Sequence, residues 1–399
     1  MFDMMVNRLN CNSVKWDVTE KASNSDKALL PMWIADMDFK VAPEIQQSLL
    51  NEIERGIFGY TYMPESAKEA IVQWVLNRHG WLVDEQTILF RKGVIPAIAD
   101  VIKGFTKKGD AVLIAPPVYP PFQQLPEFNQ RKVVHCPLVE QNGNYSMDFV
   151  LLEQLLKQDD VKLFIFCNPH NPVGKVWTEA ELKQISALCY EHNVLILSDE
   201  IHADIVFGDA QHTPIAKVAT EAEQANIITC MAPTKTFNLA GLQIAYMIVT
   251  DPQKRQQLNR QYEASGYGDL NCFAAVTMQT AYNDCAYWVE EMLQYISANM
   301  DYVIRELKVI PKVKVYKPDA TYLLWIDYRE LHISEQQMMN SLVEVGGLVL
   351  DPGTKYGVAG DGFIRLNVAY PMSTIKEAVA RLLQTFNMIE ETEVIAALR

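Results

Sequence analysis

Short apolar runs recur through the middle of the chain, and patterns of helical period lie between several of them. One such helix is predicted over residues 178–192, because Thr178 and Glu181 form a Thr-x-x-Glu capping box at its start. The apolar runs cover residues 87–90, 111–114, 163–166, 194–197 and 227–230. Continuously apolar strands that alternate with helices predict an α/β fold, in which a mostly parallel sheet is flanked by helices on both faces.

The C-terminal part of the chain has a different pattern. A long amphipathic helix is predicted over Trp288 to Leu307, and a closing helix is predicted from Ser373. Strand-like runs between them cover residues 313–316, 321–326 and 363–366. This order predicts a smaller α+β domain that the N-terminal segment completes. We therefore expect a large domain over residues 46–285, and a small domain formed by residues 1–45 and 286–399.

The composition limits the kinds of partner and the compartment. The chain has 399 residues, of which 49% are hydrophobic, so it can bury a large core. Its start has no basic stretch followed by an apolar one, and no apolar run approaches the ~18 residues that span a bilayer. The seven cysteines are scattered without a C-x-x-C pair, which favours reduced thiols over zinc or disulfides. We expect a cytoplasmic protein that holds no metal and does not bind membranes. Its net charge of −14 also disfavours binding to nucleic acid.

Polar residues and glycine follow each of the apolar runs. In parallel sheets, ligands bind beyond the carboxyl ends of the strands, so these residues are expected to lie at one edge. The segments that follow the five runs are Lys92–Pro96, Pro116–Tyr119, Asn168–Gly174, Ser198–His202 and Ala232–Lys235. Together they offer glycine, aromatic, amide, carboxylate and amine groups, and this set predicts a site for one aromatic, anionic ligand.

Lys235 and Asp199 are the candidates for the reaction itself. A lysine beside desolvating walls has a lowered pKa and can form a Schiff base with an aldehyde, as pyridoxal phosphate (PLP) requires. The alternative is a solvent-facing lysine at a strand end. Asp199 could pair with a pyridinium nitrogen and keep it protonated, or it could be a helix cap or turn residue.

The other candidates suit the remaining parts of such a ligand. Asn171 could donate its amide to a phenolic ring oxygen or initiate an Asx turn, and Tyr119 could stack on the ring or pack in the core. Residues 93–96 open a helix whose free N–H groups can bind phosphate, and Thr234 could add its hydroxyl. Arg365 could hold a substrate carboxylate bidentately or form a structural ion pair.

The order of these motifs resembles the class I/II aminotransferase superfamily of fold-type I PLP enzymes. The motifs are Asn171 to Gly174, Asp199 to His202, Thr234-Lys235 followed by Asn238 to Leu242, and Arg365. Within the superfamily the chain is most similar to the MalY/PatB-type C–S β-lyases, which include cystalysin. This narrower resemblance rests on residues 31–39, 58–60, 93–97, 117–122, 198–202 and 232–238. It covers essentially the whole chain.

The resemblance implies a role for each candidate residue. Lys235, Asp199 and Tyr119 are the expected catalytic residues, with Lys235 bound to PLP, Asp199 at the pyridinium and Tyr119 stacked on the ring. The other expected cofactor contacts are Asn171 at the ring oxygen, the Val94 and Ile95 amides and Thr234 at the phosphate, and His202. Arg365, Ala35 and Asn171 are expected to bind the substrate. The resemblance also implies a homodimer with the active site at its interface, where Tyr60 reaches the partner's phosphate.

The chain departs from aspartate aminotransferases at three positions, and the lyase branch also lacks the arginine that Gln243 replaces, whereas His202 could simply pack. Ala232 stands where those enzymes have a phosphate-binding serine, Gln243 where they have an arginine, and His202 where they have a tyrosine. The expected reaction is α,β-elimination from L-cystathionine, or from L-cysteine and other S-conjugates. An aminotransferase with the same residues is the first alternative, and a PLP-binding regulatory or interaction protein is the second. The side-chain preference is expected to depend on loops 33–39, 60–65 and 353–360.

Overall fold

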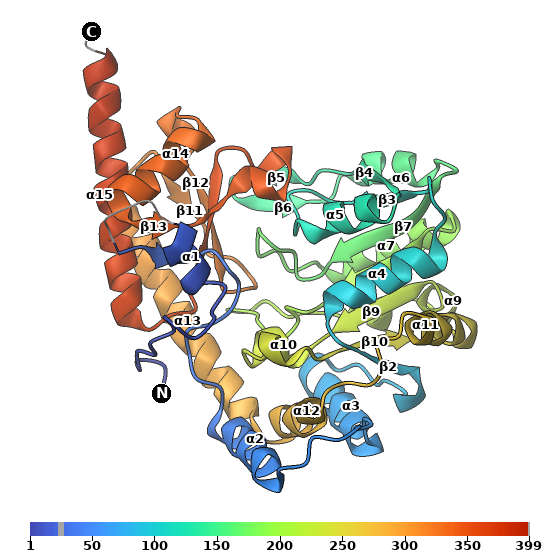
Figure 1. Cartoon of the computed structure of the whole chain (residues 1–399). Coiled ribbons are helices and arrows are strands. Elements are labelled where there is room, and N and C mark those ends of the chain that lie inside the picture. The colour runs from blue at the N-terminus through green and yellow to red at the C-terminus, as the bar shows by residue number, and fades with distance from the viewer. Residues whose placement is uncertain (23–27, 398–399) are drawn as a thin grey trace.

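The computed structural model describes residues 1–22 and 28–397, and the centre of this part of the chain is a seven-stranded sheet (Figure 1). The strand order is β2-β10-β9-β8-β7-β3-β4. The strands are β2 (Ile88–Arg91), β3 (Ala111–Ile114), β4 (Lys132–His135), β7 (Val161–Cys167), β8 (Leu195–Asp199), β9 (Ile227–Met231) and β10 (Ala245–Val249). Each predicted run forms one of these strands, and the mostly parallel sheet is confirmed.

The strands β4 and β10 were not predicted from the pattern. β4 is a half-exposed edge strand, so it has no continuous apolar run. β10 is fully buried, and its run resembles those of the parallel strands. Only its pairing shows that it runs antiparallel to both β2 and β9.

Helices cover both faces of this sheet, and the strand side chains alternate between them. In β7, Leu163 and Ile165 belong to the core under α4, whereas Phe164 and Phe166 belong to the core on the opposite face. One face carries α4 (Val94–Phe105), α5 (Pro121–Phe128) and α11 (Pro252–Ala264). The other carries α3 (Glu65–His79), α6 (Phe149–Leu156), α7 (Glu179–Glu191), α8 (Ile215–Val218), α9 (Glu221–Gln224) and α12 (Cys272–Asp284). Thr178 caps α7 through the predicted capping box.

The C-terminal part builds a separate antiparallel sheet. Among the described residues it has four strands in the order β11-β12-β15-β14. The C-terminal part as a whole contains α13 (Ala286–Leu307), β11 (Lys314–Val315), β12 (Leu323–Asp327), α14 (Glu335–Ser341), β13 (Leu348–Val349), β14 (Asp351–Pro352), β15 (Phe363–Asn367) and α15 (Met372–Ala397). The N-terminal segment joins this part, because β1 (Leu30–Pro31) pairs in parallel with β13.

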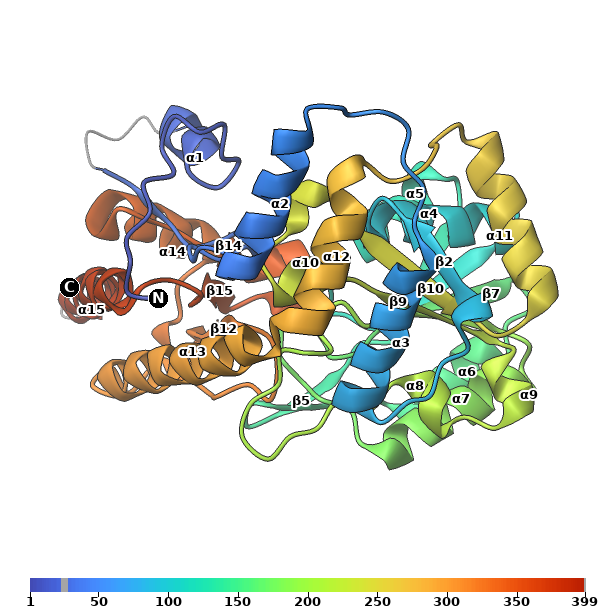
Figure 2. The ribbon, with the colours of Figure 1, turned by 90° about the horizontal axis from the view of Figure 1, so that it is seen from below.

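The remaining elements of the described residues lie within these two parts or between them. They are α1 (Asp17–Ala22), α2 (Pro43–Arg55), β5 (Val139–Gln141), β6 (Asn144–Ser146), α10 (Pro233–Thr236), and the helical turns η1 (Glu85–Thr87), η2 (Ala240–Leu242), η3 (Arg329–Leu331), η4 (Leu342–Gly346), η5 (Gly353–Tyr356) and η6 (Val358–Gly360). Figure 2 shows α2, α12 and α3 side by side. The predicted domain boundary at residue 46 falls inside α2, and α13 begins at residue 286. The division into domains stays a prediction.

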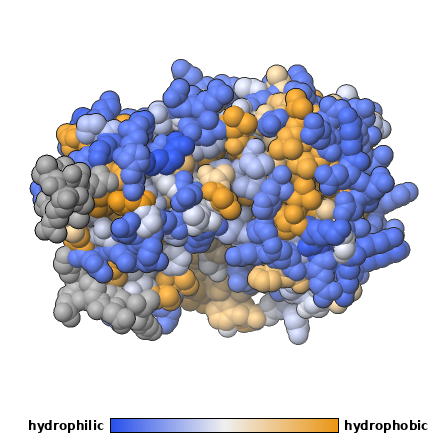
Figure 3. All heavy atoms as spheres, turned by 90° about the horizontal axis from the view of Figure 1, so that it is seen from above, coloured by the Kyte–Doolittle hydropathy of each residue, from blue (hydrophilic) through white to orange (hydrophobic). Residues whose placement is uncertain are grey.

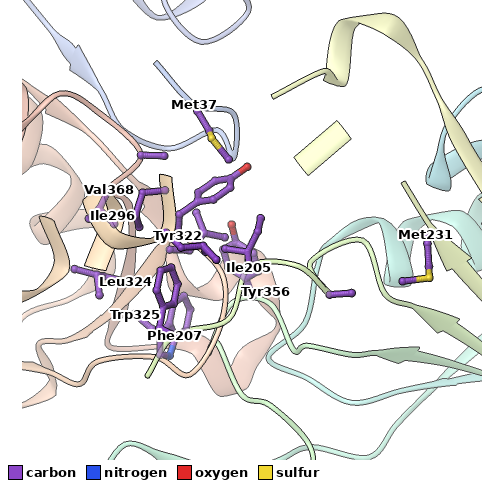
Figure 4. Close-up of a cluster of buried hydrophobic side chains, with 14 of the residues drawn as sticks. Met37, Ile205, Phe207, Met231, Ile296, Tyr322, Leu324, Trp325, Tyr356 and Val368 are labelled. Atoms are coloured by element: carbon purple, nitrogen blue, oxygen red, sulfur yellow. The ribbon is translucent and has the colours of Figure 1, made fainter. Parts of the chain in front are cut away.

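The two sheets share one buried apolar core. Figure 4 shows Tyr322, Trp325 and Tyr356 of the C-terminal part beside Ile205 and Phe207 of the loop that follows β8. Because this cluster is continuous, the C-terminal part is held firmly against the carboxyl ends of the central strands.

Neither a membrane-spanning segment nor a metal site emerges from the described residues. No helix among them combines the length and the apolar content that crossing a bilayer requires. His, Cys, Asp and Glu side chains in the same part of the chain form no group of three that could hold a metal ion.

Candidate active site

A cavity of about 480 Å³ lies where the carboxyl ends of the central strands meet the C-terminal sheet. Segments that follow β2, β3, β7, β8 and β9 all contribute to its wall. The N-terminal segment adds Trp33 to Ala35, and the C-terminal part adds Asp351, Lys355, Tyr356 and Arg365. The predicted convergence at one edge of the sheet is therefore present in the fold.

Lys235 points into this cavity from the turn that follows β9. Pro233 begins the short helix α10, and Ala232 before it is extended, so the chain turns sharply at the end of the strand. The Lys235 ammonium donates a hydrogen bond to the backbone carbonyl of Ala35, which also accepts one from the Tyr322 hydroxyl. Burial lowers the pKa of Lys235 to about 8, although the nearby Asp36 carboxylate opposes this shift.

The residues beside Lys235 anchor this turn on two sides. The Thr236 hydroxyl donates a hydrogen bond to Asp204, 2.7 Å away in the segment that follows β8. The Asn238 side chain accepts from Met37 N–H and donates to the carbonyls of Met37 and Phe39. Asn238 therefore fixes the N-terminal segment across the site, a role that the sequence pattern did not reveal.

Asp199, at the end of β8, is a buried carboxylate that faces the cavity. The described residues give it one hydrogen-bond donor, the backbone N–H of Ile201, which lies 3.1 Å from Oδ1. Burial therefore raises the pKa of Asp199 to about 7. A cationic group placed in the cavity would reverse this penalty, as a protonated ring nitrogen does.

Arg365, on β15, is buried and held by several acceptors. Its Nη1 lies 3.1 Å from the Asn171 side-chain oxygen, and its Nη2 lies 2.7 Å from both the Trp33 carbonyl and Asp351 Oδ2. A guanidinium has five N–H groups, so donors remain for a substrate carboxylate. Arg365 forms the structural ion pair with Asp351 and also lines the cavity, so its predicted contact with a substrate carboxylate stays a prediction.

Val94 and Ile95 lie in the first turn of α4 and line the cavity. N–H groups in a first helical turn have no carbonyl acceptor one turn earlier, so they are free to bind an anion. Gly93 precedes them at φ 149°, a backbone conformation that disfavours a side chain. Thr234 and Gln243 line the same cavity.

Tyr119 and His202 complete the predicted set within this chain. Tyr119 follows β3, and burial, with the Asp199 carboxylate, raises the pKa of its hydroxyl, so it stays neutral. Burial also lowers the pKa of His202 to about 3, and the neutral imidazole packs edge-on against Tyr322. Its Nδ1 has no hydrogen-bond partner among the described residues.

Tyr60 lies away from the cavity of its own chain. It belongs to the segment between α2 and α3, and its side chain is fully exposed. Its predicted reach to a partner subunit stays a prediction.

The sequence patterns missed the residues that surround Arg365. Asp351 binds Arg365 through Oδ2 and Lys355 through Oδ1, each at 2.7 Å, and Tyr356 also donates to Oδ2. Lys355 and Tyr356 belong to loop 353–360, which was expected to affect specificity, whereas Asp351 lies on β14 just before it. A Cβ on Gly353 would lie 1.9 Å from the carbonyl oxygen of Gly360, so only glycine permits the fold of this loop.

Comparisons with known proteins agree with this architecture. Residues 34–382 match the aminotransferase class I and II family. The chain is 41% identical to cystathionine β-lyase PatB of Bacillus subtilis, over 96% of this chain and 98% of PatB. It is 31% identical to protein MalY of Escherichia coli, over 97% and 99% of the two chains. The structure of PLP-containing cystalysin from Treponema denticola superposes with a TM-score of 0.94 at 32% identity, covering 98% of this chain and 99% of cystalysin. The protein thus belongs to the PLP-dependent class I and II aminotransferase family, in the C–S β-lyase branch of PatB, MalY and cystalysin.

Proposed function

We propose that this protein cleaves L-cystathionine, and also L-cysteine and other S-conjugates, by α,β-elimination to a thiol, pyruvate and ammonia. The convergence of Lys235, Asp199, Asn171 and Arg365 in one cavity carries this proposal. The similarity to PatB, a cystathionine β-lyase, favours elimination over amino transfer.

The residues present fit PLP. Asp199 is a buried carboxylate to which the described residues offer no cationic hydrogen-bond donor, and a protonated ring nitrogen would supply one. The Val94 and Ile95 amides and the Thr234 hydroxyl would hold the phosphate, and Lys235 would hold the aldehyde carbon through its amine. The Tyr119 ring would cover one face of the cofactor, and Asn171 and His202 would lie near its ring oxygen.

The protein's own residues divide the work on the substrate. Arg365, with Asn171 and the backbone N–H of Ala35, would bind the α-carboxylate and orient the Cα–H bond towards Lys235. With a pKa of about 8, Lys235 can accept the Cα proton near neutral pH. PLP, when bound, supplies an electron sink for the negative charge left at Cα. The thiolate then leaves from Cβ.

The decisive experiment measures pyruvate released from L-cystathionine by the purified, PLP-loaded protein without a keto acid. Lys235→Ala is the control, because it removes the proposed base without removing Arg365. Pyruvate from the unmutated protein alone would support β-elimination. No pyruvate, with amino transfer once a keto acid is added, would contradict the lyase proposal and favour an aminotransferase. A biological effect that survives Lys235→Ala would support a binding or regulatory role.

We also propose a homodimer with the active site at its interface, located in the cytoplasm. Apolar side chains are exposed around α2 and the segment after it, namely Leu50, Ile53, Ile57, Phe58, Tyr60 and Tyr62. The opposite face of the molecule, in Figure 3, is mostly polar and carries several apolar patches of its own. An exposed apolar surface of this kind suits contact with a second copy of the chain, to whose site Tyr60 would contribute. The buried free thiols suit a reducing compartment.

A further inference from the structure

The cavity is basic in a protein that is acidic as a whole. The chain has 49 Asp and Glu residues against 35 Lys and Arg. Among the described residues, the cavity wall reverses this balance, with four basic side chains, Lys92, Lys235, Lys355 and Arg365, and two acidic ones, Asp199 and Asp351. Such a wall selects ligands with several negative charges.

Lys355 is linked to Arg365 through the carboxylate of Asp351. Asp351 holds the two cations on its separate oxygens at 2.7 Å each, so they lie within roughly 8 Å of one another. The Lys355 side chain is 39% exposed and also lines the cavity, which places it where the cavity opens to solvent.

Asp351 holds the Lys355 ammonium in place, and the ammonium still has N–H donors for a ligand. Asp351 accepts from one of its N–H groups, and the other two remain. The ammonium lies 5.1 Å from the centre of the Trp33 ring, which also lines the cavity. Its neighbour Tyr356 packs against Trp325 (Figure 4) and accepts a backbone hydrogen bond from Val118, so the loop is fixed to both parts of the molecule.

We propose that Lys355 binds a carboxylate on the leaving-group side of the substrate, so that the site selects sulfur amino acids whose departing thiol carries a carboxylate. This inference rests on the proposed β-lyase function. Arg365 binds the α-carboxylate, and the second carboxylate of a substrate such as L-cystathionine extends through the sulfur towards the opening, where Lys355 lies. L-Cysteine has no second carboxylate and gains nothing from this contact.

A matched pair of substrates isolates this contact in the PLP-loaded protein. S-Carboxyethyl-L-cysteine and S-propyl-L-cysteine differ only in the terminal carboxylate of the leaving thiol. In Lys355→Met, kcat/KM for the carboxyethyl substrate should fall about 5- to 20-fold through KM, as expected for a partly exposed charge-assisted hydrogen bond. The value for S-propyl-L-cysteine should change less than about twofold, and Lys355→Arg should retain the preference.

The control is Lys157→Met. Lys157 also pairs with an acidic residue four positions earlier, Glu153, but does not line the cavity, so its loss should leave both substrates unaffected. An equal fall for both substrates in Lys355→Met would overturn the proposal, because Lys355 would then act only through Asp351 and Arg365. No fall for either would overturn it as well.

A binding measurement separates this inference from the proposed function. Dissociation constants of both substrates, from calorimetry on unmutated and Lys355→Met protein, should show the same change in preference. If the unmutated protein binds both substrates but releases no pyruvate, the lyase proposal fails. The ratio of the two dissociation constants, with and without Lys355, would still test whether Lys355 binds the second carboxylate. If neither the constants nor their ratio depend on Lys355, the inference fails.

Discussion

Asp199 is a residue whose burial favours function at the expense of stability. Its pKa rises from an ordinary value of 3.8 to about 7 in the folded protein, because burial disfavours the charge. Between these values the folded state retains a proton that the unfolded chain releases. Folding stability of the cofactor-free protein therefore decreases as pH rises through this window.

Asp199→Asn should remove this pH dependence. The difference in unfolding free energy between the variant and the unmutated cofactor-free protein should grow in favour of the variant by about 2–4 kcal/mol from about pH 4 to about pH 8. Denaturant titrations at both pH values test this. A constant difference between the two proteins would contradict it. The PLP-loaded variant should lose activity, because a neutral amide does not stabilise a protonated ring nitrogen.

Lys235 should titrate as an unusually weak base in the cofactor-free protein. Burial lowers its pKa to about 8, so its acetylation by dilute acetic anhydride should reach half of its maximal rate near pH 8. Mass spectrometry of the peptide that contains Lys235 gives the rate, with a free lysine derivative in the same tube as the internal reference. A midpoint at the ordinary value of 10.5 would show that the amine is solvated.

At the scale of elements, Asp204 joins the turn of Lys235 to α3. Its carboxylate accepts hydrogen bonds from Trp74 at 3.1 Å, His79 at 2.9 Å and Thr236 at 2.7 Å. Burial acts to raise the pKa of Asp204, but the hydrogen bond and charge of His79, with Arg78, lower it overall. The buried carboxylate thus stays ionised and paired.

Asp204→Ala should destabilise the protein strongly. Several buried donors would lose their common acceptor, so the unfolding free energy should fall by about 3–5 kcal/mol. Asp301→Ala is the control, since it removes an exposed ion pair with Lys317 and should cost less than about 1 kcal/mol. Similar losses in the two variants, measured by denaturant unfolding, would contradict a central role for Asp204.

At the scale of the whole molecule, the apolar surface beside α2 should mediate dimerisation. Ile57 is 79% exposed in the single chain, and Ile57→Asp would place a charge in the proposed interface. The dimer dissociation constant from analytical ultracentrifugation should rise at least about tenfold. Val309→Asp, at a residue that is 66% exposed in the C-terminal part, is the matched control and should leave it unchanged. Equal behaviour of both variants would place the interface elsewhere.

The amino-acid sequence alone predicts the layers of the fold, and most of its candidate site residues line the cavity. Continuous apolar runs predicted the buried strands, because a strand covered on both faces needs apolar side chains at every position. The residues that follow these runs then converge, since parallel strands end at the same edge. The motifs from Asn171 to Lys235 could therefore be found from their order alone.

Contacts between groups from distant parts of the chain became visible in the folded structure alone. The contact of Lys235 with Ala35, the Asn238 bonds to residues 37–39 and the sharing of Asp351 between Arg365 and Lys355 depend on how the C-terminal sheet docks. No local period or spacing encodes such contacts, because side-chain packing between separate elements fixes them. The antiparallel direction of β10 depends in the same way on its neighbours.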